Sequence, residues 1–301
     1  MSLDGLRELL DRHARPDGIT AIDGVRICRV DRTIAPESSM SGTVLAVVAQ
    51  GRKRLALGDQ VYEYGAGQYL VASVDLPVTG HAIDVDPGRP TLGFGMTLEP
   101  AAIAELLLRA GPGDLPRSTG TVRPGIAVSE APDELLDAIS RLLRLLDRPR
   151  DRKVLVPLVK REILWWLMTG EQGDVVRQLG LADSSLTHIG RAVRWIRENY
   201  TRPFRVEEVA QLSGMSVSAF HRNFQAVTAM SPIQFQKHIR LQAARLLLAN
   251  SPHDITGVGN RVGYDSPAQF SREYRRQFGA PPSIDAARMR GTAGPTPVPL
   301  P

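Results

Sequence analysis

The chain contains an internal repeat, which reads VEEVAQLSGMSVSAFHRNF at residues 206–224 and ITGVGNRVGYDSPAQFSREY at residues 255–274. The two copies keep a constant offset up to their central glycine, after which the second copy gains one residue. The matched positions are Val209 with Val258, Ala210 with Gly259, Gly214 with Gly263, Phe220 with Phe270, Arg222 with Arg272, and Phe224 with Tyr274. One structural unit is therefore expected to occur twice in this part of the chain.

Each copy has the residues that a helix-turn-helix needs. Two helices that cross steeply need a small residue at the crossing, which Ala210 and Gly259 provide. The tight turn between the helices needs a residue that adopts positive φ, which Gly214 and Gly263 provide. Any amphipathic helix pair with a glycine turn would resemble one copy alone, but two matching copies favour the helix-turn-helix.

The second helix of each copy carries a start signal and two distinct faces. Ser216 and Ser266 stand at the N-cap position, and Pro267 takes the favoured first helical position. The two aromatic residues lie four apart and are expected to face the core, whereas the arginine two residues after the first aromatic points outward. This pattern predicts that Arg222 and Arg272 lie on the exposed face.

Three segments of this region resemble the C-terminal DNA-binding domain of AraC/XylS-type regulators. They read SGMSVSAFHRNF, RLQAARLLLAN and VGYDSPAQFSREYRRQFGAPPS, and the resemblance covers about residues 187–290. It implies a bacterial-type, sequence-specific transcription regulator that binds double-stranded promoter or operator DNA, with RNA polymerase as a further partner. In that family a rigid helix, here SPIQFQKHIRLQAARLLLAN, joins the two units so that both recognition helices enter successive major-groove segments.

The resemblance assigns DNA-binding roles to positions on both recognition helices. They are Ser216, Ser218, His221, Arg222 and Gln225 in the first unit, and Ser266, Pro267, Ala268, Gln269 and Arg272 in the second. Pro267 and Ala268 offer no side-chain hydrogen-bond donor, so base readout by the second helix rests on Gln269 and Arg272. Gly259 replaces the usual alanine, which weakens its helix by up to about 1 kcal/mol. The second unit therefore either reads bases or mainly grips the phosphate backbone.

Residues 20–98 have the pattern of many short strands. The runs VRICRV, TVLAVVAQG, KRLAL, VYEYGAGQYLVAS, HAIDV and TLGFGMTL are apolar or alternating, and turn residues separate them. This close spacing favours a small antiparallel barrel or sandwich. The segment YEYGAGQYLVASVDLPVTG resembles the ligand-sensing domain of one branch of the same regulators. That resemblance implies a cupin-like barrel, with a small-molecule effector bound inside it.

From residue 99 onward, the apolar residues recur at the spacing of a helix. Helices are predicted in 99–111, 132–147 and 153–170, the last bent at Pro157. The polar, glycine-bearing stretch 170–185 is interpreted as a domain boundary.

The leucine stripe at residues 135–146 has two interpretations, an intramolecular core or a dimer seam. The family resemblance favours the seam, which implies a homodimer formed through helices 132–169.

The complete expectation is an α+β protein with an N-terminal cupin-like β-barrel and an all-α domain that contains two helix-turn-helix units. The barrel is assigned to residues 1–98, a helical linker and dimerisation segment to 99–170, and the DNA-binding domain to 187–290. The tail 291–301 has the proline and glycine composition of a disordered end.

Composition argues against several other functions. Cys28 is the only cysteine and His81 the only histidine in residues 20–98, so no disulfide, metal centre or cofactor is expected. The main alternative is a cupin-class enzyme with an appended helical domain, but its His/Glu cluster is missing, so no catalytic residue is predicted. A net charge of +5 agrees with DNA binding. No run is apolar enough for a signal peptide or membrane span, so a cytoplasmic protein without a membrane partner is expected.

Overall fold

The computed structural model describes residues 3–33, 36–111, 113–117, 123–250 and 254–291. The chain forms two compact units, an N-terminal unit over Met1–His188 and a C-terminal unit over Ile189–Thr296. The tail for which disorder was predicted lies outside the described residues, apart from Gly291.

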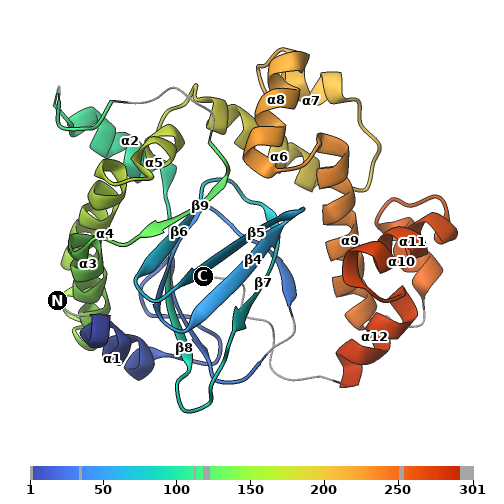
Figure 1. The fold of residues 1–301 in the computed structure, drawn as a ribbon. Coiled ribbons are helices and arrows are strands. Elements are labelled where there is room, and N and C mark those ends of the chain that lie inside the picture. Colours follow the sequence, from blue (N-terminus) through green and yellow to red (C-terminus); the bar gives the residue numbers. More distant parts are fainter. Residues whose placement is uncertain (1–2, 34–35, 112, 118–122, 251–253, 292–301) are drawn as a thin grey trace. The chain divides into compact units, whose positions relative to one another are not determined.

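The N-terminal unit is built on two antiparallel sheets that lie face to face (Figure 1). The five-stranded sheet has the order β1 (Val25–Val30), β8 (Thr91–Thr97), β3 (Val44–Gln50), β6 (Gln68–Ala72) and β9 (Ile126–Glu130). The four-stranded sheet has the order β2 (Glu37–Met40), β7 (Pro77–Ile83), β4 (Arg52–Leu57) and β5 (Gln60–Gly65). The predicted cupin-like fold is confirmed in its sandwich form, with β2 and β9 as strands that the sequence patterns did not indicate.

The five-stranded sheet is covered on both faces. One face meets the second sheet, and α1 (Leu3–His13) packs on the other through contacts with β1, β3 and β8. Strand β8 is buried along almost its whole length, which explains why its sequence is nearly continuously apolar. Helix α1 was not predicted, although its buried Leu6, Leu9 and Leu10 follow helical spacing.

Helices flank the sheets on one side of the N-terminal unit (Figure 1). They are α2 (Pro100–Arg109), α3 (Asp133–Arg144) with the short 3-10 helix η1 (Leu145–Asp147), α4 (Arg152–Thr169) and α5 (Gly173–Leu179). The leucine stripe of α3 is buried within the unit: Leu135, Leu136, Ile139, Leu142 and Leu143 are all at most 7% exposed. The dimer-seam interpretation of this stripe was therefore wrong, because the stripe packs on its own chain.

The stretch interpreted as a domain boundary contains helix α5. Val175 and Val176 are buried there, and so are two charged residues of the same helix, Asp174 and Arg177. Their side chains form an ion pair at 2.5 Å, and Arg177 also donates to the carbonyl of Met168. Asp174 and Arg177 therefore form a compensated buried pair and are not part of a solvated linker.

We predict that Arg177→Met destabilises the N-terminal unit by about 3 kcal/mol, because buried Asp174 loses its 2.5 Å ion pair and keeps the longer one, at 3.9 Å, with Arg123. Arg161→Met is the matched control, since Arg161 pairs with Glu105 at 2.7 Å on a surface where the two side chains are 38% and 41% exposed. That change should alter the free energy of unfolding by at most about 1 kcal/mol. Urea unfolding of both variants measures the difference, and equal effects would contradict the structural role of the α5 pair.

The C-terminal unit is all-helical. Its helices are α6 (Ser185–Glu198), which begins at the end of the N-terminal unit, then α7 (Val206–Leu212), α8 (Val217–Thr228), α9 (Pro232–Asn250), α10 (Ile255–Arg261), α11 (Pro267–Phe278) and α12 (Pro282–Gly291). The pairs α7–α8 and α10–α11 are the two predicted helix-turn-helix units, and α9 is the helix that joins them. Phe220, Phe224, Phe270 and Tyr274 are completely buried, as their spacing predicted.

Candidate DNA interface and sensor pockets

The turn in each helix-turn-helix has the backbone that the sequence predicted. Gly214 has φ of 72° and Gly263 has φ of 93°, values that favour glycine over residues with a side chain. At the helix crossings, Ala210 is fully buried, and a Cβ at Gly259 would lie 3.2 Å from Cδ1 of Phe270. The second crossing is therefore tight enough to explain why Gly259 replaces the alanine expected there.

The two serines at the helix starts act as N-caps. Ser216 Oγ accepts from the Ala219 N–H at 3.4 Å, and Ser266 Oγ accepts from the Gln269 N–H at 3.3 Å. Pro267 occupies the first turn of α11. The caps fix where α8 and α11 begin, and so they fix which side chains each helix presents.

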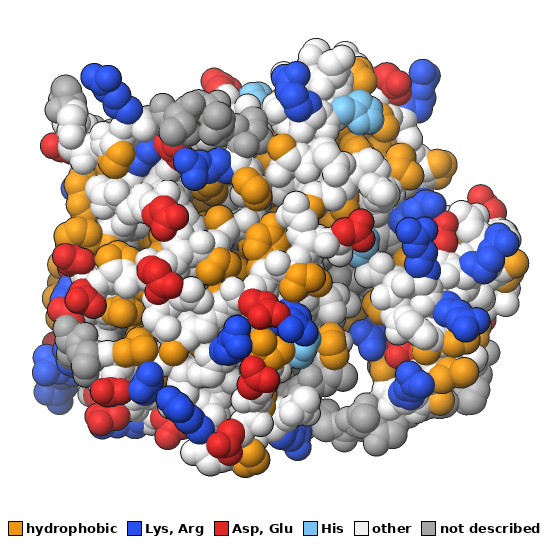
Figure 2. Space-filling view, in the orientation of Figure 1, with side chains coloured by type: hydrophobic (Ala, Val, Ile, Leu, Met, Phe, Trp, Pro, Cys, Tyr) orange, Lys and Arg blue, Asp and Glu red, His pale blue; other side chains and the backbone are white. Residues whose placement is uncertain are grey.

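The remaining predicted DNA-binding residues are exposed. On α8 they are Ser218, His221, Arg222 and Gln225, and on α11 they are Pro267, Ala268, Gln269 and Arg272. In each helix this exposed row lies away from the buried aromatic pair. Lys and Arg side chains also gather over the part of the C-terminal unit formed by α10–α12 (Figure 2). The geometry of each recognition helix is thus compatible with the predicted roles.

Gln269 is held in place by a network that the sequence analysis missed. Its amide donates to Glu273 Oε1 at 3.1 Å, and Glu273 also accepts from Lys237 Nζ and from the Tyr264 hydroxyl, each at 2.8 Å. Burial raises the pKa of Glu273, but these three donors outweigh it and hold the pKa below its ordinary value. The four-residue spacing of Gln269 and Glu273 on one helix was the available signal.

Helix α9 ties the two helix-turn-helix units together through Arg240. Its Nε donates to the Tyr200 carbonyl at 2.6 Å, and its Nη1 donates to the Gly263 carbonyl at 2.7 Å. Tyr200 precedes the first unit, whereas Gly263 is the turn glycine of the second. Gln236 adds a donor to the Tyr200 carbonyl at 3.0 Å. One side chain therefore connects the entry of the first unit to the turn of the second.

We predict that Gly263→Ala destabilises the C-terminal unit by roughly 3 kcal/mol, because positive φ strain adds to a steric clash. A Cβ at Gly263 would lie 2.2 Å from the carbonyl oxygen of Thr201.

Gly279→Ala is the control, because Gly279 has φ of 74° but nothing within 4 Å of its Cβ position. It should cost only about 1 kcal/mol, from backbone strain alone. Calorimetric unfolding of the two variants checks the comparison, and equal losses would show that the Thr201 contact contributes nothing.

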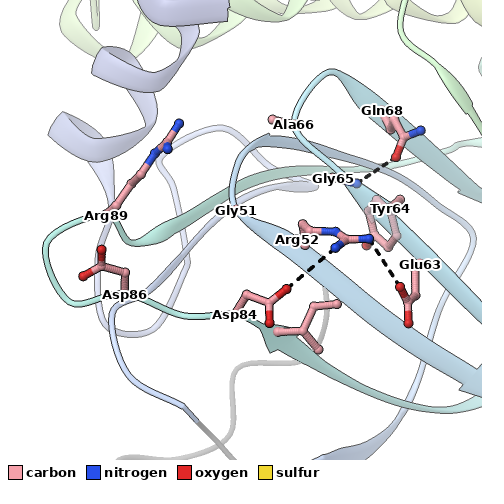
Figure 3. A pocket seen from close by; sticks show the side chains of 11 residues that line it. Gly51, Arg52, Glu63, Tyr64, Gly65, Ala66, Gln68, Asp84, Asp86 and Arg89 are labelled. Carbon is pink, nitrogen blue, oxygen red and sulfur yellow. Dashed lines mark hydrogen bonds and ion pairs between the residues drawn. The ribbon is translucent and has the colours of Figure 1, made fainter.

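Two pockets of the N-terminal unit lie at its sheets. The larger of these, of about 540 Å³, has five charged residues among the eleven that line it (Figure 3). In it Arg52 lies between Glu63 at 3.5 Å and Asp84 at 3.7 Å, with Asp86 and Arg89 across the pocket. The smaller, of about 270 Å³, is lined by residues of β1, β2, β3 and β8 and their loops.

Across the described residues, no group of three or more His, Cys, Asp or Glu side chains is arranged to hold a metal ion. No described helix combines the length and apolar character needed to cross a bilayer.

Two family models match the chain. The model of the AraC-type transcriptional regulator N-terminus matches residues 21–175, and a helix-turn-helix domain model matches residues 209–287. The first match covers the two sheets and extends into α5, and the second covers most of both helix-turn-helix units.

The relatives with similar sequences are transcriptional activators. The virulence regulon transcriptional activator VirF of Yersinia enterocolitica is 26% identical over 265 residues, which cover 86% of this chain and 93% of VirF. The activator RhaS of Salmonella schwarzengrund is 25% identical over 147 residues, which cover 48% of this chain and 51% of RhaS.

Solved structures of ToxT from Vibrio cholerae share the fold. The apo form of a ToxT point variant has a TM-score of 0.54 at 9% identity, and the match covers 90% of this chain and all of ToxT. ToxT bound to (E)-4-(8-methylnaphthalen-1-yl)but-3-enoic acid has a TM-score of 0.51 at 10% identity and covers 88% of this chain and 98% of ToxT.

Proposed function

The chain belongs to the AraC-type transcriptional regulators, and we propose that α8 and α11 are its recognition helices, which read successive major-groove segments of promoter or operator DNA. It is a DNA-binding transcription regulator and not an enzyme, and the cupin-class enzyme alternative finds no support among its relatives. The observation that carries the proposal is the exposed row on each of α8 and α11. The hydrogen bonds of Arg240 on α9, to Tyr200 before the first unit and to Gly263 in the turn of the second, support it.

The proposed base contacts differ between the two helices. On α8, Ser218, His221, Arg222 and Gln225 offer several donors and acceptors, whereas on α11 the donors are Gln269 and Arg272. The Gln269 amide already donates to Glu273, so Arg272 is the leading base reader of the second unit. An arginine binds guanine with two parallel hydrogen bonds, which makes Arg222 and Arg272 the strongest candidates for readout. Ser216, Ser266, Pro267 and Ala268 lie at the helix starts, where backbone N–H groups suit phosphate contacts.

We predict that Arg222→Ala and Arg272→Ala each weaken binding of the full chain to its best DNA site by about 1–3 kcal/mol. The site is first selected from a random duplex library, and affinities are then measured by fluorescence anisotropy on that site and on unrelated DNA.

Arg202→Ala is the matched control, because Arg202 is exposed but precedes the first helix-turn-helix. This change should weaken binding to the selected site and binding to unrelated DNA equally. Binding by the wild-type chain and by each variant should weaken as the salt concentration rises. An arginine of either recognition helix that can be replaced without loss on the selected site has no base-reading role. A wild-type chain with no DNA affinity at low salt would refute the proposed readout.

We also propose a homodimer through helices 132–169, with α4 as the contact. Helix α4 buries Ile163, Leu164, Leu167 and Met168 near its C-terminal end, whereas apolar residues of its first turns are exposed. Its Val154 and Leu158, four residues apart on one face, are nevertheless 65% and 54% exposed, and Leu155 beside them is 38% exposed. A second copy of the chain would cover this face. A dimer would also raise the effective concentration of its two readers on neighbouring half-sites.

We predict that Val154→Glu combined with Leu158→Glu converts the dimer to a folded monomer, because the change places charges in the seam. Leu108→Glu is the control, since Leu108 is 89% exposed on α2, outside the proposed seam. Light scattering gives the mass of each variant in solution. A wild-type monomer, or a double variant that stays dimeric, would contradict the proposed seam.

The N-terminal unit is proposed to bind a small-molecule effector that shifts the regulator between two states of different DNA affinity. The two pockets beside its sheets support this proposal, and so does the ligand-bound ToxT structure with the same fold. We further infer that the protein acts in the cytoplasm and that RNA polymerase is its partner at the promoter.

A further inference from the structure

Helix α11, the proposed second recognition helix, carries a carboxylate beside its exposed row. Glu273 lies four residues after Gln269 on this helix, and its side chain is 23% exposed. DNA phosphates repel a carboxylate, so an acidic residue beside a DNA-facing row weakens binding unless another charge offsets it. Lys237 of α9 forms an ion pair with Glu273 at 2.8 Å and supplies that charge. The chain therefore retains an acidic residue at this place and compensates its charge.

Three donors hold the Glu273 carboxylate, and they occupy both of its oxygens. Oε1 accepts from Lys237 Nζ at 2.8 Å and from Gln269 Nε2 at 3.1 Å, and Oε2 accepts from the Tyr264 hydroxyl at 2.8 Å. Tyr264 is itself fixed, since it is 4% exposed and its ring packs on Phe270 with the centroids 5.3 Å apart. The donors come from α9, from the turn before α11 and from α11, so the carboxylate is held in place before any DNA is bound.

The carboxylate determines which way the Gln269 amide points. With a lysine at 2.8 Å, Glu273 is ionised at neutral pH, and an ionised carboxylate only accepts hydrogen bonds. The atom of the amide that faces Glu273 is therefore the nitrogen. The oxygen and nitrogen of a planar amide lie on separate arms, so Oε1 points away from Glu273, and no described residue donates to it. The Gln269 N–H is bound to Ser266 Oγ at 3.3 Å, so the backbone is fixed as well. Gln269 thus presents a hydrogen-bond acceptor on the exposed row of α11.

We propose that Glu273 is a positioning residue, which holds Gln269 as an acceptor and so makes this position of α11 select adenine or cytosine on the contacted DNA strand. In the major groove, adenine and cytosine each present an amino group that donates a hydrogen bond, whereas guanine and thymine present only acceptors. A glutamine that was free to turn its amide over would suit all four bases. The inference rests on the proposed readout by α11 and goes beyond it, because it names the bases that one residue selects.

The test determines base preference by selection from a random duplex library. The full chain is used as wild type, as Gln269→Ala and as Glu273→Met, and the base position read by Gln269 is the one whose preference Gln269→Ala removes. In the wild type we expect adenine or cytosine there over guanine and thymine by roughly 5-fold. In Glu273→Met that preference should fall below about 2-fold, whereas the preference read by Arg272 should stay. Guanine or thymine in the wild type, or an unchanged preference in a folded Glu273→Met chain, would overturn the proposal.

A double variant shows whether Glu273 acts through Gln269. If it does, adding Glu273→Met to Gln269→Ala changes the base preference no further, because the amide that the carboxylate holds is already absent. A further change in the preference at that position contradicts this route. So does a Gln269→Ala chain that keeps the wild-type preference at every position.

Gln277→Met is the matched control for a merely structural role. Gln277 lies four residues after Glu273 on α11, and its side-chain amide contacts Nε2 of His238 on α9 at 2.6 Å. This variant removes a side-chain contact between the same two helices and leaves the amide of Gln269 as it is. It should keep the wild-type preference for adenine or cytosine. If it relaxes this preference as much as Glu273→Met does, Glu273 only ties α11 to α9 and the proposal is wrong.

Thermal unfolding establishes whether each variant is folded, and Glu273→Gln replaces Glu273→Met if the latter is not. Glutamine retains the size of the side chain, but its amide donates as well as accepts, so Gln269 can turn over and the base preference should again fall. A folded Glu273→Gln chain with the wild-type preference would contradict the proposal.

A measurement with a modified base needs no change at Glu273. Binding is measured by fluorescence anisotropy on a duplex with adenine at the position read by Gln269, and on the same duplex with that adenine lacking its 6-amino group. The loss of the amino group should weaken wild-type binding roughly 5-fold and binding by Gln269→Ala much less. Equal losses in the two chains would show that Gln269 does not accept from this base.

The outcomes separate this inference from the proposed readout. A chain that selects a DNA site through Arg272 and shows no preference that depends on Gln269 refutes this inference alone. A chain without selective DNA binding refutes the readout by α8 and α11, on which this inference rests.

Discussion

The guanidinium of Arg240 connects the two helix-turn-helix units by hydrogen bonds. It donates to the backbone on either side, to Tyr200 before the first unit and to Gly263 in the turn of the second. The joining helix α9 therefore carries a hydrogen-bonded connection between the two units. We propose that this connection sets the relative direction of α8 and α11 and so lets their side chains act together on DNA. Gly263 is essential to it, since a side chain at that position would collide with the Thr201 carbonyl.

Charges inside the two units are handled in different ways. In α5 the buried Asp174 and Arg177 compensate each other, and in the C-terminal unit Glu273 is surrounded by donors from three other residues. Both groups are compensated within their own unit, and buried charges that are compensated in this way can be kept in a folded structure.

The sequence predicted the helix-turn-helix units well because their rules are local. These rules concern residues within about 20 positions of one another, namely the small residue at the crossing, the positive-φ glycine, the N-cap and the aromatic spacing. The structure has each of these features in both copies of the repeat. The strands of the N-terminal unit were also found, since apolar runs and turn residues alternate clearly there. The predicted DNA-binding residues within α8 and α11 are exposed, which is compatible with the contacts proposed for them.

The elements that were missed depend on what packs against them. The leucine stripe of α3 would have the same sequence pattern whether its own chain or a second copy covered it. In the structure its own chain covers it. Helix α5 is short, and its charged residues resemble those of a solvated linker because the sequence does not show that they pair. The hydrogen bonds of Arg240, and the one from Lys237 to Glu273, join residues that are 23 to 40 positions apart, so a single sequence could not reveal them. Only the contact of Gln269 with Glu273 has a local signal, the spacing of four residues on one helix.

If α8 and α11 read DNA together, as proposed, the connection through α9 also limits which DNA sites can evolve for this regulator. B-DNA turns once in about 10.5 base pairs, so inserting one base pair between the two recognised segments rotates the second by roughly 34°. A reader with a loose joint could follow such an insertion by swivelling, but one fixed through Arg240 would lose its contacts to one segment. Operators for this protein should therefore vary in their bases far more readily than in their spacing, and promoters under its control would diverge by substitution while keeping the helical phase of the two segments.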